Sequence, residues 1–388
     1  MLITRLALKN WRNFRKVDVA LRERVYVIGP NASGKSNFLD VLRFLRDVAK
    51  PEGGGLQKAV KDRGGITKLR CLLARKDPEI SIEVELSEKV DTDPVWRYTL
   101  AFKSEGKGQQ RPLISQEKVE DLRVGKLLLN RPNNKDDKAD PERLTQSHLE
   151  QINTNREFRE VADFFSSVTY LHLVPQLLKH AEELGGYRME DDPFGQAFLE
   201  RIAKTPEKTS HARLSKIEEV LRVCVPNMRK LRLERDKITG APHLEALYEH
   251  WRPDAGWQRE DQFSDGTLRL LGIMWGLLDG NSLLLLEEPE LSLNEDIVRK
   301  IHPLIWRMQR QAKYRRQVFI TTHSEALLQE KSIDPREVVR LEPTQDGTIA
   351  VAPSDEDKAL IAAGYSVAET MLPKVKPAQV DQLSLFKL

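Results

Sequence analysis

The stretch Gly29-Pro30-Asn31-Ala32-Ser33-Gly34-Lys35-Ser36 directly follows the apolar run Val25-Tyr26-Val27-Ile28. It fits the pattern Gly-x-x-x-x-Gly-Lys-Ser, in which glycines allow backbone N–H groups to turn inward around phosphate oxygens. The apolar run predicts a buried strand leading into this loop, and a helix is expected over 37–48. Lys35 would bring positive charge to the terminal phosphates, Ser36 a hydroxyl to magnesium, and the helix its positive dipole end. The sequence therefore predicts a site for ATP and Mg²⁺; the predicted contacts are Gly29, Pro30, Asn31, Ala32, Ser33, Gly34, Lys35, Ser36 and Asn37.

A second apolar run, 283–286, ends in two carboxylates, Glu287 and Glu288, followed by Pro289. It predicts a buried strand that delivers acidic groups to the phosphate site. We expect Glu287 to hold magnesium, directly or through water, and Glu288 to polarise the attacking water as a general base. The alternative is a strand that ends in two solvated glutamates.

A further strand is predicted over 317–321, with Thr322-His323-Ser324 at its end. His323 is suited to sense the γ-phosphate of a bound nucleotide. A lone histidine is more often structural, so this catalytic assignment depends on its place after the other two motifs.

Four segments together resemble the ABC-type ATPase head that SMC, RecF and OLD-like proteins share, a group that includes AAA-type ATPases of DNA repair and phage defence. The four segments are Leu8-Lys9-Asn10-Trp11-Arg12-Asn13-Phe14, the phosphate-binding loop (P-loop), Phe263-Ser264-Asp265-Gly266-Thr267, and Glu287-Glu288-Pro289-Glu290 with the later His323. These segments lie toward both ends of the chain. The middle of the chain matches the family only in outline. The resemblance implies an α/β P-loop NTPase fold with an antiparallel β lobe and a helical lobe.

In that family two heads sandwich two ATP molecules, so the resemblance implies a homodimer with composite sites. Ser264 and Gly266, at the start of a helix predicted over 267–278, would contact the γ-phosphate bound by the other subunit. Arg12 would lie near the base or ribose. Gln176, after the strand-like 168–174, is our candidate for the glutamine that links the nucleotide to the helical lobe.

Two positions depart from the family pattern. The family usually has Asp where Glu287 stands, and often Asp or His where Asn294 stands. Glutamate can still bind magnesium, whereas Asn294 is expected to weaken communication between the two sites. The departure at Asn294 thus bears on coupled hydrolysis and not on ATP binding.

The composition is that of an ordinary globular protein, with 388 residues, 31% of them charged and 40% hydrophobic. No apolar stretch approaches the roughly 20 residues that span a bilayer, and no signal-peptide pattern opens the chain. Cys71 and Cys224 have no metal-ligand spacing and predict neither a zinc site nor a disulfide. We expect a cytoplasmic protein with no membrane partner.

We expect four parts along the chain: an N-terminal ATPase lobe over 1–175, a helical lobe over 176–262, a C-terminal ATPase lobe over 263–352 and a tail over 353–388. Alternation predicts antiparallel strands over 80–86 and 95–102, and helical patterns occupy 142–166, 193–204 and 212–223. The segment Phe263-Ser264-Asp265-Gly266-Thr267 is called the signature below. No sustained heptads lie in the roughly 230 residues between the P-loop and this signature, which argues against long coiled-coil arms. The roughly 65 residues after His323 contain no acidic cluster typical of a Toprim nuclease domain.

The net charge of +3 is small, but the basic residues are unevenly placed. Two clusters stand out: Arg222, Arg229, Lys230, Arg232, Arg235 and Lys237, and Arg307, Arg310, Lys313, Arg315 and Arg316. Such runs are usually solvated helix faces, and the family resemblance favours contact with DNA.

The chain ends Gln382-Leu383-Ser384-Leu385-Phe386-Lys387-Leu388 after a linker rich in Pro and Lys. This end resembles the peptide by which bacterial polymerases and repair proteins dock on the sliding clamp. Leu385 and Phe386 could fill an apolar pocket with Gln382 at its rim and Leu383 beside them. Alternatively, the apolar residues pack on the protein's own surface.

The sequence thus favours an ATP-hydrolysing dimeric switch that acts on DNA or on a separate effector or nuclease, in repair or in anti-phage defence. Two alternatives stay open. One is the energising subunit of a membrane transporter, which usually carries a Leu-Ser-Gly-Gly signature unlike Phe263-Ser264-Asp265-Gly266. The other is a nucleotide-dependent scaffold with negligible turnover, which Asn294 leaves possible.

Overall fold

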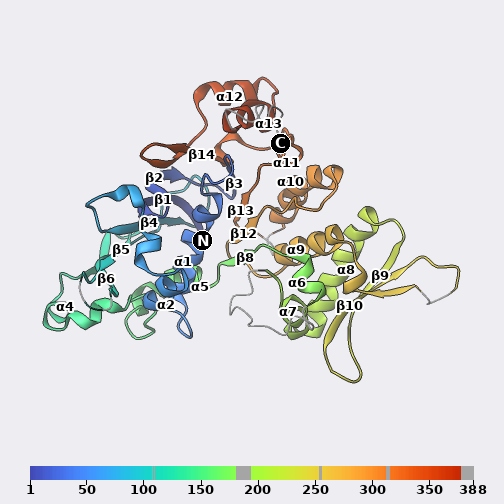
Figure 1. Ribbon diagram of the computed structural model, residues 1–388, viewed down its shortest axis with the longest axis horizontal. Coiled ribbons are helices and arrows are strands. Elements are labelled where there is room, and N and C mark those ends of the chain that lie inside the picture. Colours follow the sequence, from blue (N-terminus) through green and yellow to red (C-terminus); the bar gives the residue numbers. More distant parts are fainter. Residues whose placement is uncertain (107, 109, 181–193, 253–255, 312–314, 377–388) are drawn as a thin grey trace, which may run out of the picture. The chain divides into compact units, whose positions relative to one another are not determined.

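The computed structural model describes residues 1–106, 108, 110–180, 194–252, 256–311 and 315–376. The chain divides into two compact units. Unit 1 comprises Met1–Thr169 and Arg316–Leu388, and unit 2 comprises Tyr170–Arg315. In Figure 1, unit 1 therefore combines the blue and cyan start of the chain with its red end.

The first sheet of unit 1 is entirely antiparallel. Its strands follow the order β2-β1-β4-β5-β6-β7. In β4 the burial of the side chains alternates, with Ile80, Ile82 and Val84 inward, as expected for a sheet with one buried face. The strands are β1 (Leu2–Trp11), β2 (Phe14–Ala20), β4 (Ile80–Ser87), β5 (Trp96–Ser104), β6 (Pro112–Asp121) and β7 (Lys126–Arg131).

The second sheet of unit 1 positions the P-loop. Its strands follow the order β15-β14-β3-β13, in which β3 (Arg24–Ile28) is parallel to both β13 (Val318–Thr321) and β14 (Val338–Thr344). The edge strand β15 (Gly347–Val351) is antiparallel to β14. Because β3 and β13 are parallel neighbours, the segments after them emerge at the same edge of the sheet, where α/β proteins bind ligands. The strand predicted before the P-loop is confirmed.

Helix α1 (Lys35–Ala49) follows the P-loop and is buried on most of its faces. Its Phe44 contacts Trp11 of β1 and Phe102 of β5, with ring centroids 5.1 and 5.5 Å apart, so α1 packs against the antiparallel sheet. The other α-helices of unit 1 are α2 (Leu56–Asp62), α3 (Ile66–Leu69), α4 (Lys135–Ala139), α5 (Arg159–Ser166), α11 (Glu325–Leu328), α12 (Asp355–Ala362) and α13 (Val367–Met371). Its 3₁₀ turns are η1 (Leu72–Ala74), η2 (Pro141–Thr145), η3 (Arg156–Phe158), η6 (Pro335–Glu337) and η7 (Leu372–Val375).

Unit 2 is built around α9 (Asp265–Leu278), whose side chains from Thr267 onward are all buried. Strand β12 (Leu284–Glu287) neighbours the short β8 (Thr169–Leu171). Trp275 of α9 contacts Phe198 edge to face, with ring centroids 6.4 Å apart. Unit 2 also contains α6 (Pro175–Lys179), α7 (Phe198–Lys204), α8 (Glu207–Cys224), α10 (Glu295–Gln309) and the 3₁₀ turn η4 (Glu260–Gln262).

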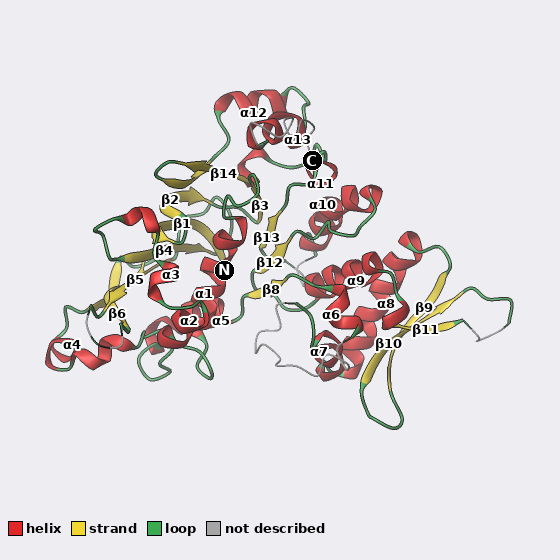
Figure 2. Ribbon diagram, viewed as in Figure 1, coloured by secondary structure: helices red, strands yellow, loops and turns green. Residues whose placement is uncertain are grey.

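The region expected to be a helical lobe also contains a three-stranded antiparallel sheet (Figure 2). It consists of β9 (Met228–Arg235), β10 (Pro242–Tyr248) and β11 (Trp257–Arg259). The basic residues 229–235 therefore lie on a strand, and the alternative that this run is a solvated helix face does not hold there. The physical reason is the period-two pattern of Leu231 and Leu233, which pair with Ala246 and Leu244 in the neighbouring strand.

The helix predicted over 142–166 was also too long, since α5 spans only Arg159–Ser166. Upstream, Thr154 and Asn155 use their side chains to bond backbone carbonyls; Asn155 donates to Leu149 O at 3.0 Å. Such local bonds offer the backbone an alternative to helix.

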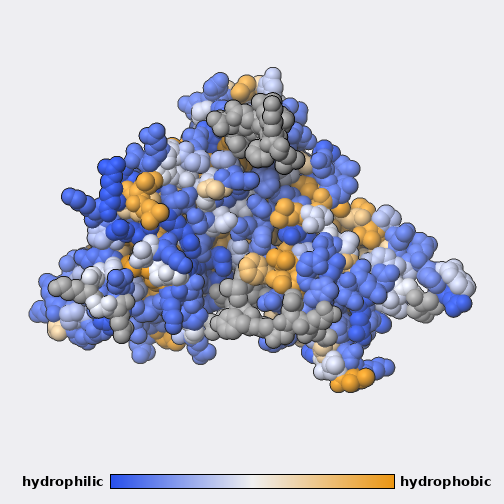
Figure 3. Space-filling model, in the orientation of Figure 1, coloured by the Kyte–Doolittle hydropathy of each residue, from blue (hydrophilic) through white to orange (hydrophobic). Residues whose placement is uncertain are grey.

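The face of the molecule drawn in Figure 3 is mainly hydrophilic, with small scattered apolar areas. Among the residues described, no helix has the length and apolar character needed to cross a membrane.

Candidate nucleotide-binding site

The P-loop lies in unit 1. The chain leaves β3 at Ile28 and enters α1 at Lys35, so the loop joins a strand to a helix as predicted. Two loop residues, Ala32 and Gly34, adopt left-handed backbone conformations with φ of 62° and 97°. Left-handed residues in such a loop help to direct backbone N–H groups into a concavity that suits an anion. The positive end of the α1 helix dipole also favours an anion at this place.

Two side chains of the loop fit a polyphosphate. The Lys35 ammonium donates to the carbonyl oxygens of Gly29 and Pro30 at 3.1 and 3.4 Å, and the residue is only 8% exposed. The Ser33 hydroxyl is fully buried, and within the described ranges it has no hydrogen-bond partner. Because buried polar groups are normally satisfied, a phosphate oxygen is a suitable partner for this hydroxyl, and the Lys35 ammonium supplies a positive charge beside it. The P-loop therefore fits the predicted nucleotide.

The segment that opens the chain packs on the P-loop and on α1. Arg12 forms an ion pair with Asp40 of α1, with Nη2 and Oδ2 2.6 Å apart. Burial would raise the pKa of Asp40, but the charges of Arg63 and Arg12 outweigh it and the pKa is lowered. Contact of Arg12 with the base or ribose stays a prediction. Ser36 and Asn37 occupy the first turn of α1, and Asn37 donates from Nδ2 to Oδ1 of Asn13 at 2.8 Å.

A cavity of about 520 Å³ opens beside the N-terminal part of the P-loop. His323, which follows β13, lines it together with Gly29, Pro30 and Asn31. The structure thus brings His323 to the P-loop, as expected from the parallel strands. The opposite wall comes from the C-terminal segment, including Ala368, Leu372 and Lys376.

The two predicted carboxylates lie in unit 2. Glu287 is the last residue of β12, and one of its carboxylate oxygens accepts a hydrogen bond from the hydroxyl of Tyr170. His172 Nδ1 lies 3.3 Å from the backbone oxygen of Glu287. Glu288 follows with a left-handed φ of 43°, so the chain turns sharply where the predicted general base stands. Neither Tyr170 nor His172 was predicted from the sequence.

The signature segment begins α9. Ser264 caps the helix, and its hydroxyl accepts from the backbone N–H of Thr267 at 3.1 Å. A side chain at Gly266 would lie 2.7 Å from the carbonyl oxygen of Ser292, so this position has no room for a Cβ. Asp265 pairs with Lys179 at 2.7 Å.

Gln176, the predicted nucleotide-linking glutamine, also contacts the signature. Its amide donates to Asp265 at 2.9 Å from the second position of α6. In this arrangement Gln176 contributes to the position of the signature helix, and its contact with the nucleotide stays a prediction.

Arg269 is a further residue that the sequence did not single out. It lies one turn after Asp265 on α9 and is 6% exposed. Burial lowers its pKa, while the charges of Glu290, Asp265 and Glu288 act in the opposite direction. A buried cation thus lies within electrostatic reach of the predicted general base and of the signature.

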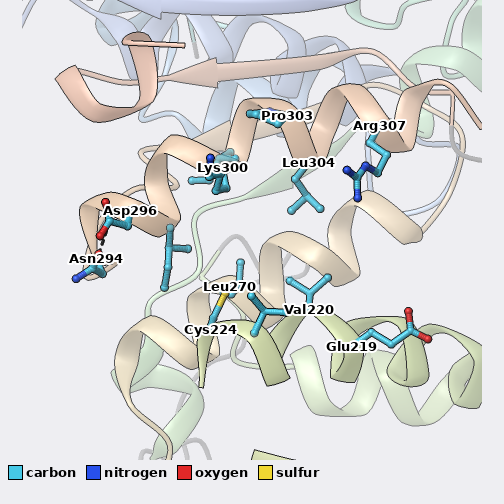
Figure 4. Close-up of a pocket in the computed structure, with 13 residues that line it drawn as sticks. Glu219, Val220, Cys224, Leu270, Asn294, Asp296, Lys300, Pro303, Leu304 and Arg307 are labelled. Carbon is cyan, nitrogen blue, oxygen red and sulfur yellow. Dashed lines mark hydrogen bonds between the residues drawn. The ribbon is translucent and has the colours of Figure 1, made fainter. Parts of the chain in front are cut away.

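Asn294 caps α10, and its side chain accepts from the N–H of Asp296 at 2.9 Å (Figure 4). It lies at the edge of a hollow of about 770 Å³ between α8, α9 and α10, lined by apolar side chains such as Val220 and Leu304. This capping role accounts for an asparagine at the position. Its effect on communication between sites stays a prediction.

Among the described residues, three of the six members of the first basic cluster form ion pairs with glutamates, including Arg222 with Glu218. Arg229 pairs with Glu249 at 2.6 Å and Arg232 with Glu245 at 2.7 Å. Lys230 and Lys237, by contrast, are exposed and have no ion pair within the described ranges. In the second cluster Arg316 is buried and Lys313 lies outside the described residues. The predicted clamp-binding residues Gln382, Leu383, Leu385 and Phe386 also lie outside them.

Solved structures with a similar fold include an SMC head bound to the C-winged helix domain of ScpA. The TM-score is 0.58 at 15% identity, covering 92% of this chain and 99% of that one. A second is an SMC head domain with an extended coiled coil, bound to the C-terminal domain of ScpA derived from Pyrococcus furiosus. Its TM-score is 0.50 at 14% identity, covering 93% of this chain and 98% of that one. At these identities the likeness concerns the fold.

Curated relatives include two proteins named DNA replication and repair protein RecF. The one from Roseiflexus castenholzii is 29% identical over 101 residues, which cover 24% of this chain and 26% of the relative. The one from Bacillus mycoides is 28% identical over 90 residues, which cover 23% and 24%. The match thus spans about a quarter of these relatives' length.

The fold and motifs define this chain as an ABC-type ATPase head of the SMC/RecF-like group. Residues 25–329 match the family described as "AAA domain, putative AbiEii toxin, Type IV TA system". The chain belongs to this family.

Proposed function

We propose that this protein binds ATP with magnesium and hydrolyses it, as a dimeric switch that acts on DNA or on a partner effector. The observation that carries the proposal is the geometry of the P-loop. Two of its residues have left-handed backbone conformations, and it presents the Lys35 ammonium and the buried Ser33 hydroxyl. These groups offer charge and hydrogen bonds of the kind a triphosphate requires.

Several side chains would contribute to the reaction, each in a different role. Lys35 would bind the terminal phosphates, and Ser36 and Glu287 would hold magnesium. The metal ion, when bound, neutralises phosphate charge. Glu288 would accept a proton from the attacking water, and His323 would sense the γ-phosphate.

Dimerisation is part of the same proposal. Ser264 begins α9 with its hydroxyl at the N-terminus of the helix, where an anion is favoured. The Ser264 and Gly266 of one copy would contact the γ-phosphate held by the P-loop of the other. Hydrolysis would then open the dimer.

The biological setting is proposed from the resemblance. The curated relatives are named for DNA replication and repair, and the SMC heads were solved with a partner domain. We infer action on DNA or on a separate effector or nuclease in the cytoplasm, in repair or in anti-phage defence, with the tail as a docking element for the sliding clamp.

The test is steady-state phosphate release with and without double-stranded DNA, for wild type, Lys35→Ala and Glu288→Gln. We expect turnover that DNA increases and that both substitutions abolish. Light scattering with ATP should give a dimer for Glu288→Gln and a monomer for Lys35→Ala. Nucleotide binding without any turnover in the wild type would instead favour a scaffold.

A further inference from the structure

One carboxamide connects three segments that lie far apart in the sequence. Asn13 Nδ2 donates to the carbonyl oxygen of Ser33 in the P-loop and to Oγ1 of Thr348 in β15, both at 2.8 Å. Its Oδ1 accepts from Asn37 Nδ2 of α1, also at 2.8 Å. Both N–H donors and the carbonyl of this side chain are therefore in use.

The local backbone is shaped around Asn13. A Cβ at Gly34 would lie 2.2 Å from Asn13 Nδ2, and one at Gly347 would lie 2.8 Å from Asn13 O. Both glycines have φ near +100°, where other residues are strained. Gly34, the second glycine of the P-loop pattern, thus provides space for Asn13 as well as its left-handed backbone.

Asparagine is the residue type that this geometry requires. Aspartate would lack the two donors, and Gln would place the amide one methylene farther out. The Ser33 carbonyl accepts from the Asn13 side chain, so the peptide between Ser33 and Gly34 is fixed in the orientation that directs its N–H the other way. In P-loops, backbone N–H groups of this stretch are the ones that surround phosphate oxygens.

Thr348 forms two hydrogen bonds with Asn13. Besides accepting from Asn13 Nδ2, it donates its backbone N–H to Asn13 O at 2.8 Å. Thr348 is 4% exposed and lies on the hairpin of β14 and β15, which leads into the C-terminal segment. That segment lines the cavity beside Gly29 and Asn31, and Thr348 is connected to Ser33 of the P-loop through Asn13.

We propose that Asn13 is a positioning residue that holds the P-loop in its phosphate-binding conformation, and that Thr348 transmits nucleotide occupancy to the β14–β15 hairpin. The inference rests on the proposed function, because it assigns a support to the nucleotide site. Nothing in it requires dimerisation or DNA.

The test compares Thr348→Val, which keeps the shape and removes Oγ1, with Thr348→Ser, which keeps the hydroxyl. Binding of ATPγS with magnesium is measured by titration calorimetry. The valine variant leaves a donor of Asn13 unpaired, so its Kd should rise by about tenfold. The serine variant should stay within about twofold of wild type, and KM should rise more than kcat falls in the valine variant.

A second readout follows the hairpin directly. Hydrogen exchange of residues 344–351 should slow on addition of nucleotide in wild type and in Thr348→Ser, and should not slow in Thr348→Val. Unchanged nucleotide affinity in Thr348→Val, or wild-type hairpin exchange that ignores the nucleotide, would overturn the inference. Failure of wild type to bind ATPγS more tightly than Lys35→Ala would instead overturn the proposed function.

Discussion

The hydroxyl of Tyr170 donates a hydrogen bond to a carboxylate oxygen of Glu287, the residue expected to hold magnesium. Tyr170 is 6% exposed and belongs to the short strand β8, which neighbours β12. A carboxylate fixed by an outer partner keeps one orientation toward a metal ion, and loss of such partners commonly weakens metal binding.

Tyr170→Phe should therefore raise the magnesium concentration needed for half-maximal ATP turnover by about tenfold. Only the hydroxyl is removed, so the fold should be retained. Tyr365→Phe is the matched control, because Tyr365 is 51% exposed. Magnesium titrations that coincide for the two variants would show that Tyr170 does not support the metal site.

DNA stimulation should depend on the two unpaired lysines of the β9 region. Lys230→Glu with Lys237→Glu should reduce the stimulation and its sensitivity to salt, because unpaired cations are the ones that neutralise phosphates. Lys16→Glu with Lys89→Glu, which changes two exposed lysines of unit 1 by the same charge, is the control. Equal loss of stimulation in both double variants would indicate a general effect of charge.

The stability of unit 1 should depend on the ionisation of Glu150. Burial raises the pKa of this carboxyl to about 7, although it accepts the N–H of Ser147 at 2.6 Å. The folded state then holds a proton that the unfolded state has released, so the free energy of unfolding falls as pH rises from about 4.5 to about 7. The loss is on the order of 3 kcal/mol at most.

Glu150→Gln removes this ionisation. Its stability relative to wild type should therefore increase between pH 5 and pH 8, as measured by urea unfolding. Glu157→Gln, a change at an exposed side chain, should show no such trend. A Glu150→Gln difference that is the same at both pH values would mean that the carboxyl titrates normally.

Docking of the tail on the sliding clamp predicts a strong effect of two apolar side chains. Leu385→Ala with Phe386→Ala should weaken binding to purified bacterial clamp by about thirtyfold, since buried apolar anchors dominate such contacts. Asp381→Ala should leave binding nearly unchanged. Absence of clamp binding by the wild-type protein would favour the alternative that the tail packs on the protein itself.

Features encoded by neighbouring residues could be predicted from the sequence. The P-loop from Gly29 to Ser36 lies between a strand and a helix as expected, because the apolar run and the glycine spacing are local. His323 meets the P-loop because two parallel strands end at the same edge.

Contacts between distant residues could not be predicted. Tyr170 and Glu287 are 117 positions apart, and Asn13 and Thr348 are 335 apart. Neither tyrosine nor threonine carries a motif that indicates its partner. The sheet of β9, β10 and β11 could not be predicted for another reason. In β9 the alternation consists of two leucines, Leu231 and Leu233, among charged residues, and so short a pattern does not distinguish a strand from a charged helix face.

The most direct measurement of the central claim is single-turnover release of phosphate from ATP by wild type, Glu288→Gln and Glu295→Gln. Glu295 is a matched control, since its side chain is 80% exposed at the start of α10. We predict a rate loss of at least about a hundredfold in Glu288→Gln with ATP binding retained, and a wild-type rate in Glu295→Gln. Hydrolysis by Glu288→Gln at the wild-type rate would contradict the assignment of the general base and of the site built around it.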